Sequence, residues 1–292
     1  MRVGEAARPL PPLARTGDQR VSAVTAVPTT ERVAMPVLET RGLSKSFGPV
    51  TALDSVDFEV RAGEVMALVG DNGAGKSTLI KCIAGIYSID TGDVYSNGEH
   101  VSISGPKDAG RLGIEVVYQD LALCDNLDVV QNMYLGREAH DIFFRLREPE
   151  MESRTAEVLR GLSVTTIRSI RQQVASLSGG QRQSVAIGRA VMWNSKIVIL
   201  DEPTAALGVA QTRQVLDLVR RLAEQGLSVV LVSHNLHDIF EVADRITVLR
   251  LGRNVAIFER SQTNQQEVVQ AITAGIPTKV AGISETDTEA PE

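Results

Sequence analysis

The residues from Gly70 to Thr78 have the types and spacing that suit binding of a phosphate group. They read G-x-x-x-x-G-K-S, after an apolar run over 65–69 that predicts a buried strand and before a segment over 79–84 that predicts a helix. In this context the glycines let backbone N–H groups converge on one anion, and the helix N-terminus adds its dipole. An isolated match could be only a Gly-rich turn, but the flanking strand and helix favour a phosphate-binding loop (P-loop). Its residues are Gly70, Asp71, Asn72, Gly73, Ala74, Gly75, Lys76, Ser77 and Thr78.

Two neighbouring carboxylates follow another apolar run, over 196–200, which is typical of a strand buried on both faces. A carboxylate at the end of such a strand is costly unless it binds something, and Mg²⁺ is the natural partner for Asp201, with the Ser77 hydroxyl as a further ligand. Because neighbours in an extended backbone point in different directions, Glu202 can reach an attacking water. We interpret Asp201 as a metal ligand and Glu202 as a general base, a role typically worth ~10²–10⁴-fold in rate.

Two more polar residues, Gln119 and His234, follow the apolar runs over 114–118 and 228–232. The Gln119 amide could ligate Mg²⁺ through its oxygen and donate to water through its nitrogen, although alone it is equally typical of a solvated strand end. His234 could donate a hydrogen bond to a terminal phosphate. Its place at the tip of a core strand favours this role over a structural one.

A second possible phosphate cradle precedes the helix that starts near residue 181. It consists of Ser178, Gly179, Gly180 and Gln181. Alone, these residues are more typical of an ordinary Gly-Gly turn. If they form a cradle, the chain has two, and the simplest arrangement is a head-to-tail pair of chains that share each nucleotide.

The alternation of predicted strands and helices indicates an α/β fold with a mainly parallel sheet. We expect strands over 37–41 and 56–60, a turn at Asp90-Thr91-Gly92, and a hairpin over 93–103 whose Asn-Gly pair favours a type I′ turn. These strands predict an antiparallel subdomain beside the nucleotide core. Leu, Met, Arg and Glu at helical spacing predict a helical insert over about 125–176.

Composition limits the remaining classes. The 292 residues carry a net charge of −6, which argues against a general nucleic-acid binder. Cys82 and Cys124 lack metal-site spacing and are interpreted as reduced thiols. No apolar run approaches the ~18–20 residues that span a bilayer, and no signal peptide is recognisable. We therefore expect a cytoplasmic domain over 37–275, between disordered ends over 1–36 and 276–292, with Met35 as a possible true start.

The order of these motifs resembles the ATP-binding cassette (ABC) family, the ATPase subunits of ABC transporters, over about residues 37–275. The resemblance makes Gly70–Ser77 the Walker A motif, Gln119 the Q-loop, Leu177–Gln181 the signature, Ile197–Glu202 Walker B and His234 the switch. It implies an ABC ATPase fold, a P-loop NTPase core that binds ATP and Mg²⁺. It also implies that Phe47 stacks on adenine, and that the signature contacts the ATP of the opposite subunit.

Three stretches, the first of them the Walker A motif itself, are similar to those of the ATPases of bacterial monosaccharide importers of the ribose, xylose and fructose type. They are Gly70–Ser77, Tyr118–Leu123 and Glu202–Gly208. The resemblance implies a homodimer of single cassettes at the cytoplasmic face of the inner membrane, bound to integral membrane permease subunits that dock near 121–133. A periplasmic or extracellular sugar-binding protein is implied indirectly. Gly208 stands where most of the wider family has Asp.

Three alternatives remain at this point. The chain could power a transporter for another substrate, including an exporter of lipid or polysaccharide, because only the residues within these three stretches favour a sugar as the substrate. A soluble ABC protein that acts on ribosomes or DNA would be expected to have two cassettes or a long coiled coil. A non-hydrolysing regulatory cassette is disfavoured because Glu202, Gln119 and His234 are all present.

Overall fold

The computed structural model describes residues 35–275. The predicted disorder over 1–36 and 276–292 therefore concerns residues outside this range, apart from Met35 and Pro36. Pro36 already belongs to the first strand, so the folded part begins one residue earlier than predicted.

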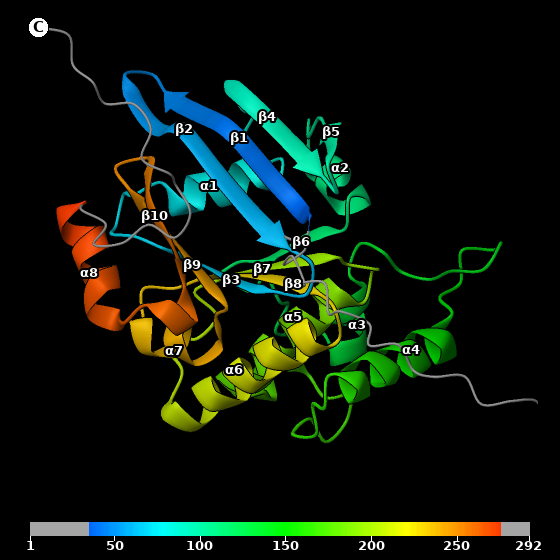
Figure 1. Cartoon of the computed structure of the whole chain (residues 1–292). Helices are drawn as coiled ribbons and strands as arrows, with labels where there is room; N and C mark the ends of the chain where they lie inside the picture. Colours follow the sequence, from blue (N-terminus) through cyan, green and yellow to red (C-terminus); the bar gives the residue numbers. More distant parts are fainter. Residues whose placement is uncertain (1–34, 276–292) are drawn as a thin grey trace, which may run out of the picture. The chain divides into compact units, whose positions relative to one another are not determined.

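A six-stranded sheet forms the centre of the structure, in the order β10-β9-β3-β8-β7-β6 (Figure 1). All its pairs are parallel except β9 with β10. Every residue of β3 and β8 is buried, as expected for parallel strands covered on both faces. The mainly parallel α/β core is thus confirmed. The strands are β3 (Val65–Val69), β6 (Ile114–Val117), β7 (Ile197–Asp201), β8 (Ser228–Val232), β9 (Arg245–Arg250) and β10 (Arg253–Glu259).

A second, antiparallel sheet has the order β2-β1-β4-β5. Its strands are β1 (Pro36–Phe47), β2 (Val50–Arg61), β4 (Thr91–Ser96) and β5 (Glu99–Val101), so β1 and β2 are longer than predicted. The hairpin turn is confirmed, with positive φ at both Asn97 and Gly98. The predicted turn at Asp90-Thr91-Gly92 is wrong, because β4 begins at Thr91 and pairs with β1. Gly92 instead permits close approach, since a Cβ there would lie 2.5 Å from the Gly42 carbonyl oxygen.

Helices cover both faces of the central sheet. One apolar layer joins it to α5, α6, α7 and α8, and another joins it to α1 and the antiparallel sheet. The short helix α2 was not predicted. The helices are α1 (Lys76–Ile83), α2 (Pro106–Arg111), α5 (Gly179–Val191), α6 (Val209–Glu224), α7 (Leu236–Val242) and α8 (Gln265–Ala274).

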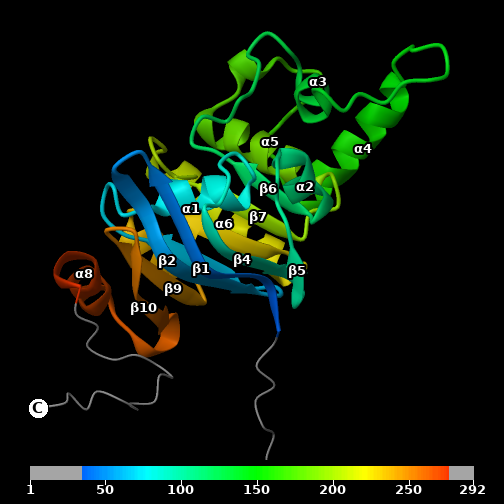
Figure 2. The same cartoon turned by 90° about the horizontal axis from the view of Figure 1, so that it is seen from above.

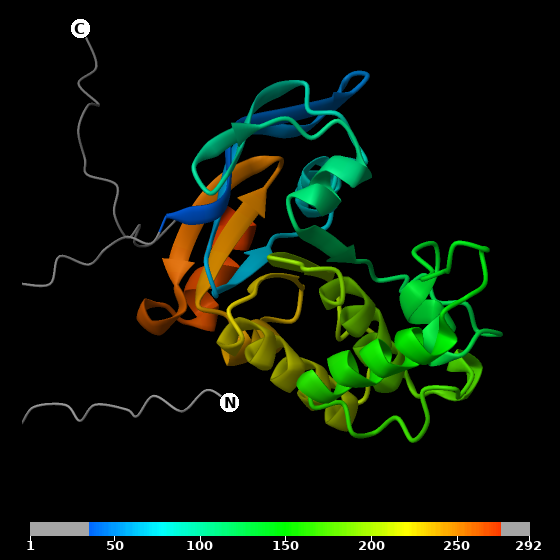
Figure 3. The same ribbon diagram turned by 90° about the vertical axis from the view of Figure 1, so that its right-hand side faces the viewer.

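The segment between β6 and α5 contains α3 (Val129–Tyr134), α4 (Glu148–Gly161) and a single 3₁₀ turn, η1 (Val174–Ser176). Together with α5 it has its own apolar cluster, which includes Met133, Met151 and Leu159. It lies away from the antiparallel sheet, as two perpendicular views show (Figure 2, Figure 3).

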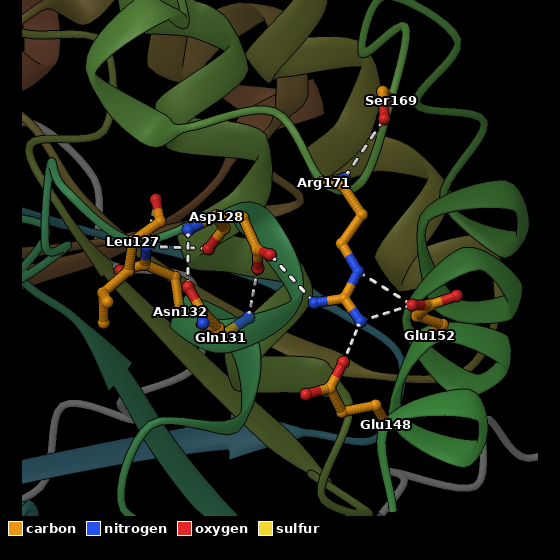
Figure 4. A network of polar contacts seen from close by, with 8 residues as sticks. All are labelled: Leu127, Asp128, Gln131, Asn132, Glu148, Glu152, Ser169 and Arg171. Carbon is orange, nitrogen blue, oxygen red and sulfur yellow. Dashed lines mark hydrogen bonds and ion pairs between the residues drawn. The ribbon is translucent and has the colours of Figure 1, made fainter.

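Two polar networks hold this insert together (Figure 4). Asn132 is fully buried, and its side chain bonds the backbone of Cys124, Leu127 and Asp128. Nearer the surface, the Arg171 guanidinium bonds Glu148 and Glu152 on α4 and the N-cap residue of α3, Asp128. The chain leading to α5 is thereby tied to both insert helices.

We predict that Asn132→Ala lowers the free energy of unfolding by about 2–4 kcal/mol, because it removes four hydrogen bonds of a fully buried side chain and leaves the Cys124 N–H without its partner. Urea denaturation with an unchanged m-value measures this loss. Glu157→Ala, on the exposed side of α4, serves as control and should change stability far less. Equal stability of the two variants would contradict the role given to Asn132.

Candidate nucleotide site

The P-loop joins β3 to α1, and its backbone shape depends on glycine. Gly70, Gly73 and Gly75 all have positive φ. A Cβ on Gly70 would lie 2.3 Å from the Leu249 carbonyl oxygen, and one on Gly75 would lie 2.8 Å from that of Ala52. No side chain caps the N-terminus of α1. Its first N–H groups are therefore available to an anion.

Lys76 folds back over this loop. Its Nζ atom donates hydrogen bonds to the carbonyl oxygens of Gly70, at 2.7 Å, and Asp71, at 3.1 Å. Burial lowers the pKa of Lys76, while the charges of Glu202, Asp201 and Asp71 oppose that shift. The ammonium group thus ties the two ends of the loop together and experiences the charges of both Walker B carboxylates.

Asp201 ends β7, where it pairs with Val232 of β8. Burial raises the pKa of Asp201, the charge of Glu202 raises it further, and Lys76 and Lys81 lower it. A divalent cation beside this carboxylate would offset its desolvation. The described residues contain no cluster of three His, Cys, Asp or Glu side chains that could hold a metal. Mg²⁺ commonly takes one or two carboxylates and completes its shell with phosphate and water oxygens, so the Asp201 carboxylate would be a suitable ligand for it.

The backbone at Glu202 does not continue the extended conformation of β7, although the sequence predicted an extended backbone there. Its φ is +51°, so its backbone is left-handed instead of extended. Its N–H still donates to the Val232 carbonyl oxygen, and its side chain lies 2.8 Å from Nδ1 of His234. The Glu202 side chain is only 16% exposed, whereas that of His234 is 74% exposed. A strained residue of this kind persists only where its surroundings fix it, and such residues cluster at functional sites.

Gln119 and Phe47 lie on other elements, and in the described part of the chain neither forms a hydrogen bond, ion pair or ring contact with the lysine, carboxylates and histidine described above. β6 ends at Val117, so the exposed Gln119 lies two residues beyond the strand. Burial raises the pKa of its neighbour Tyr118, and the charge of Asp201 raises it further. Phe47 ends β1, is 43% exposed, and packs against the Tyr87 ring at 5.1 Å in an edge-to-face geometry. Sequence reasoning missed Tyr87, because no spacing rule links it to Phe47.

The second predicted cradle has a structural role of its own. Ser178 caps α5, with Oγ accepting from the Gln181 N–H while Gln181 Oε1 accepts from the Ser178 N–H. Gln181 Nε2 also donates to the Thr166 carbonyl oxygen, so the Gln181 side chain is used within the chain. The S-x-x-Q pattern of a capping box is visible in the sequence, and it accounts for the start of α5.

The two cradles lie against different elements. A Cβ on Gly179 would meet Leu207, and one on Gly180 would meet Gln211 of α6. The P-loop packs instead on Ala52 and Leu249. The structure therefore brings Lys76, Asp201, Glu202 and His234 together within one chain, and it leaves Ser178–Gln181 at a separate place.

Gly208 is not required by local packing. It precedes α6 with φ −73° and ψ 161°, and a Cβ there would meet nothing within 4 Å. An Asp at this position would fit and could cap α6, which has no side-chain cap. Packing within one chain thus does not explain why Gly208 stands where most of the wider family has Asp.

We predict that Asp201→Asn raises the melting temperature of the nucleotide- and metal-free protein at neutral pH. The raised pKa means that the charged carboxylate is less favourable in the folded than in the unfolded state. The gap to the wild type should shrink as the pH falls and the carboxyl group becomes protonated. Differential scanning calorimetry measures both effects, with Glu99→Gln on β5, where the side chain is exposed, as control. A lower melting temperature for Asp201→Asn at pH 7 would contradict this account.

Comparison with curated proteins gives two close relatives among many. The chain is 45% identical over 244 residues to the fructose import ATP-binding protein FrcA of Rhizobium meliloti. It is also 45% identical over 238 residues to the xylose/arabinose import ATP-binding protein XylG of Sulfolobus acidocaldarius. Each match covers 82% of this chain and 94% of the relative.

Solved structures show the same fold. The ADP conformation of MJ1267, an ATP-binding cassette of an ABC transporter, superposes with a TM-score of 0.71 at 26% identity, covering 82% of this chain and 96% of that one. The dimeric structure of MJ0796, a bacterial ABC transporter cassette, gives 0.65 at 25% identity, covering 76% and 98%. The ABC transporter family profile matches residues 53–205. The chain belongs to the ABC transporter family and is one of its ATP-binding, ATPase cassettes.

Proposed function

We propose that this chain is the ATP-hydrolysing subunit of an ABC importer for a monosaccharide such as fructose, ribose or xylose. The observation that carries this proposal is the pairing of Glu202 with His234 beside Lys76 and Asp201. A cassette with this pair has the groups that turnover requires. The sugar class is supported by the two relatives, whose names specify import of fructose and of xylose or arabinose.

In the proposed mechanism the P-loop N–H groups and Lys76 hold the phosphates. Glu202 accepts a proton from the attacking water, and His234 orients the Glu202 carboxylate and contacts the terminal phosphate. Ser77, Asp201 and Gln119 would hold Mg²⁺, which when bound neutralises charge that develops on the phosphate oxygens. Phe47 and Tyr87 would form the aromatic surface for adenine.

The proposed active form is a homodimer in which each ATP lies between the P-loop of one copy and Ser178-Gly179-Gly180 of the other. The separation of the two cradles within one chain supports this form, as does the existence of a dimeric relative structure. With ATP present the Ser178 hydroxyl could donate to a phosphate, because its capping role uses it as an acceptor.

The proposed location is the cytoplasmic face of the membrane, in contact with permease subunits and, through them, with a sugar-binding protein. None of the helices between residues 35 and 275 has the length and hydropathy that crossing a bilayer requires. A 170 Å³ groove beside the insert is lined by residues that include Met133, Leu135, Arg189 and Trp193. This groove is a candidate binding site for a permease helix. Of its lining residues, only Met133 belongs to the segment 121–133 that the sequence suggested for this contact.

We predict that Glu202→Gln keeps ATP affinity, lowers turnover by about 10²–10⁴-fold and accumulates an ATP-bound dimer, because the amide cannot accept the proton from water. Nucleotide binding, phosphate release and size-exclusion chromatography measure the three effects. Lys76→Ala is the matched control, which should weaken ATP binding itself. Wild-type turnover by Glu202→Gln would exclude Glu202 as the base.

The importer assignment is tested by purifying the chain with its permease from native membranes and reconstituting the complex in liposomes. We expect ATP hydrolysis to be stimulated by one monosaccharide together with its binding protein, and the stimulating sugar names the substrate. Stimulation by a non-sugar substrate would favour a different transporter. Association with ribosomes or DNA alone would overturn the transport function.

A further inference from the structure

The turn over 202–207, which follows β7, is strained at two positions. Glu202 has a φ of +51° and Ala206 a φ of +62°, in the left-handed region that residues other than glycine rarely adopt. Glu202 also precedes Pro203, and a residue before proline favours an extended backbone. The local sequence therefore disfavours this turn, and contacts from other parts of the chain must hold it.

The contact between Glu202 and His234 is too exposed to hold the turn by itself. The His234 side chain is 74% exposed, and pairs that are open to solvent contribute little net stability. The pairing of β7 with β8 extends only to Asp201 and Val232. Beyond it, one backbone hydrogen bond runs from the Glu202 N–H to the Val232 carbonyl oxygen. The turn thus needs a further anchor past the ends of the strands.

A buried hydrogen bond supplies this anchor and ties the turn to α7. The Thr204 hydroxyl donates to Oδ2 of Asp238 at 2.7 Å, and Asp238 is only 2% exposed. Among the residues that the structure describes, no other side chain bonds this carboxyl group. A buried carboxyl group is costly without a partner, and a hydrogen bond is strengthened where water is excluded. The bond between Thr204 and Asp238 is therefore a firm link between the two segments.

Asp238 is in turn fixed relative to His234. Asn235 follows His234 and caps α7, with its side chain accepting a hydrogen bond from the His237 N–H. Asp238 lies in the first turn of this helix, and the next residue, Ile239, is fully buried in the apolar layer that joins α7 to the central sheet. A capped helical turn whose position is set by the core thus connects His234 to Asp238.

We propose that Thr204 and Asp238 are positioning residues for ATP hydrolysis, because their hydrogen bond holds the Glu202 carboxylate against His234. This inference rests on the proposed function, in which Glu202 is the base. Thr204 lies two residues after Glu202, and Asp238 lies four residues after His234, so the bond closes a loop that contains both groups. Without this bond the strained turn relaxes and the carboxylate is displaced from the attacking water. A displacement of about 1 Å at a reacting group can lower a rate by ~10²-fold.

The test replaces Thr204 by valine, which keeps the shape of the side chain and removes its hydroxyl group. We expect Thr204→Val to lower kcat by about tenfold or more and to leave the Kd for ATP unchanged, because the P-loop is untouched. Thr204→Ser and Asp238→Asn each keep a donor and an acceptor, so turnover should stay near the wild-type level. Thr212→Val makes the same change on α6, in a cavity that Asp238 also lines, and is the matched control.

Repeating Thr204→Val in the Glu202→Gln protein separates positioning from a general effect on the fold. Because Thr204 acts through the Glu202 carboxylate, the added substitution should change the residual single-turnover rate by less than about twofold. The double variant Thr204→Val with Asp238→Leu removes both partners and leaves no buried polar group unpaired. It should show the same loss of kcat, and it provides the test if Thr204→Val alone does not fold.

Three results would overturn the proposal and leave the proposed function intact. They are an equal fall in rate with and without the Glu202 carboxylate, a loss of ATP binding that accompanies the loss of turnover, and Thr204→Ser as slow as Thr204→Val. Near-wild-type turnover by Thr204→Val would overturn it as well. Wild-type turnover by Glu202→Gln alone would instead overturn the proposed function, and this inference with it.

Discussion

The site depends on one electrostatic constraint. Asp201 ends the buried strand β7, Glu202 follows it, and Lys76 begins α1 after the loop from β3, where solvent only partly screens their charges. The Lys76 ammonium donates hydrogen bonds to two loop carbonyl groups, and Glu202 pairs with His234. A nucleotide phosphate with a divalent cation supplies the charges that these groups lack. The glycine-dependent loop and the left-handed Glu202 both maintain this arrangement.

A second constraint is mechanical. Arg189, on the helix that starts at the signature, donates hydrogen bonds to the carbonyl oxygens of Leu121 and Ala122, just after Gln119. Burial lowers the pKa of Arg189, in keeping with its enclosed position. Asn132 bonds the backbone at the start of the insert, and Arg171 ties the chain that approaches α5 to α3 and α4. The segment just after Gln119 is therefore bonded directly to the helix that Ser178 caps.

Much of this arrangement could be predicted from the sequence. β8 has the bounds of its predicted apolar run, and the type I′ turn is correct, because apolar runs and Asn-Gly pairs are strong local signals. Gly92 was misread, since a glycine that admits a neighbouring backbone looks the same in sequence as one that makes a turn. The left-handed Glu202 and the contact of Phe47 with Tyr87 depend on long-range packing. No local pattern predicts them.

The central claim is that each complete ATP site combines the P-loop of one copy with the Ser178-Gly179-Gly180 turn of another. Mixing two variants tests it most directly, with Lys76→Ala in one chain and Ser178→Arg in the other, each inactive alone. In the mixed dimer one site carries both defects and the other carries none. The account predicts that ATPase activity reappears on mixing, at up to about a quarter of the wild-type level if pairing is random and sites are independent. A mixture no more active than the two separate preparations would contradict a shared site.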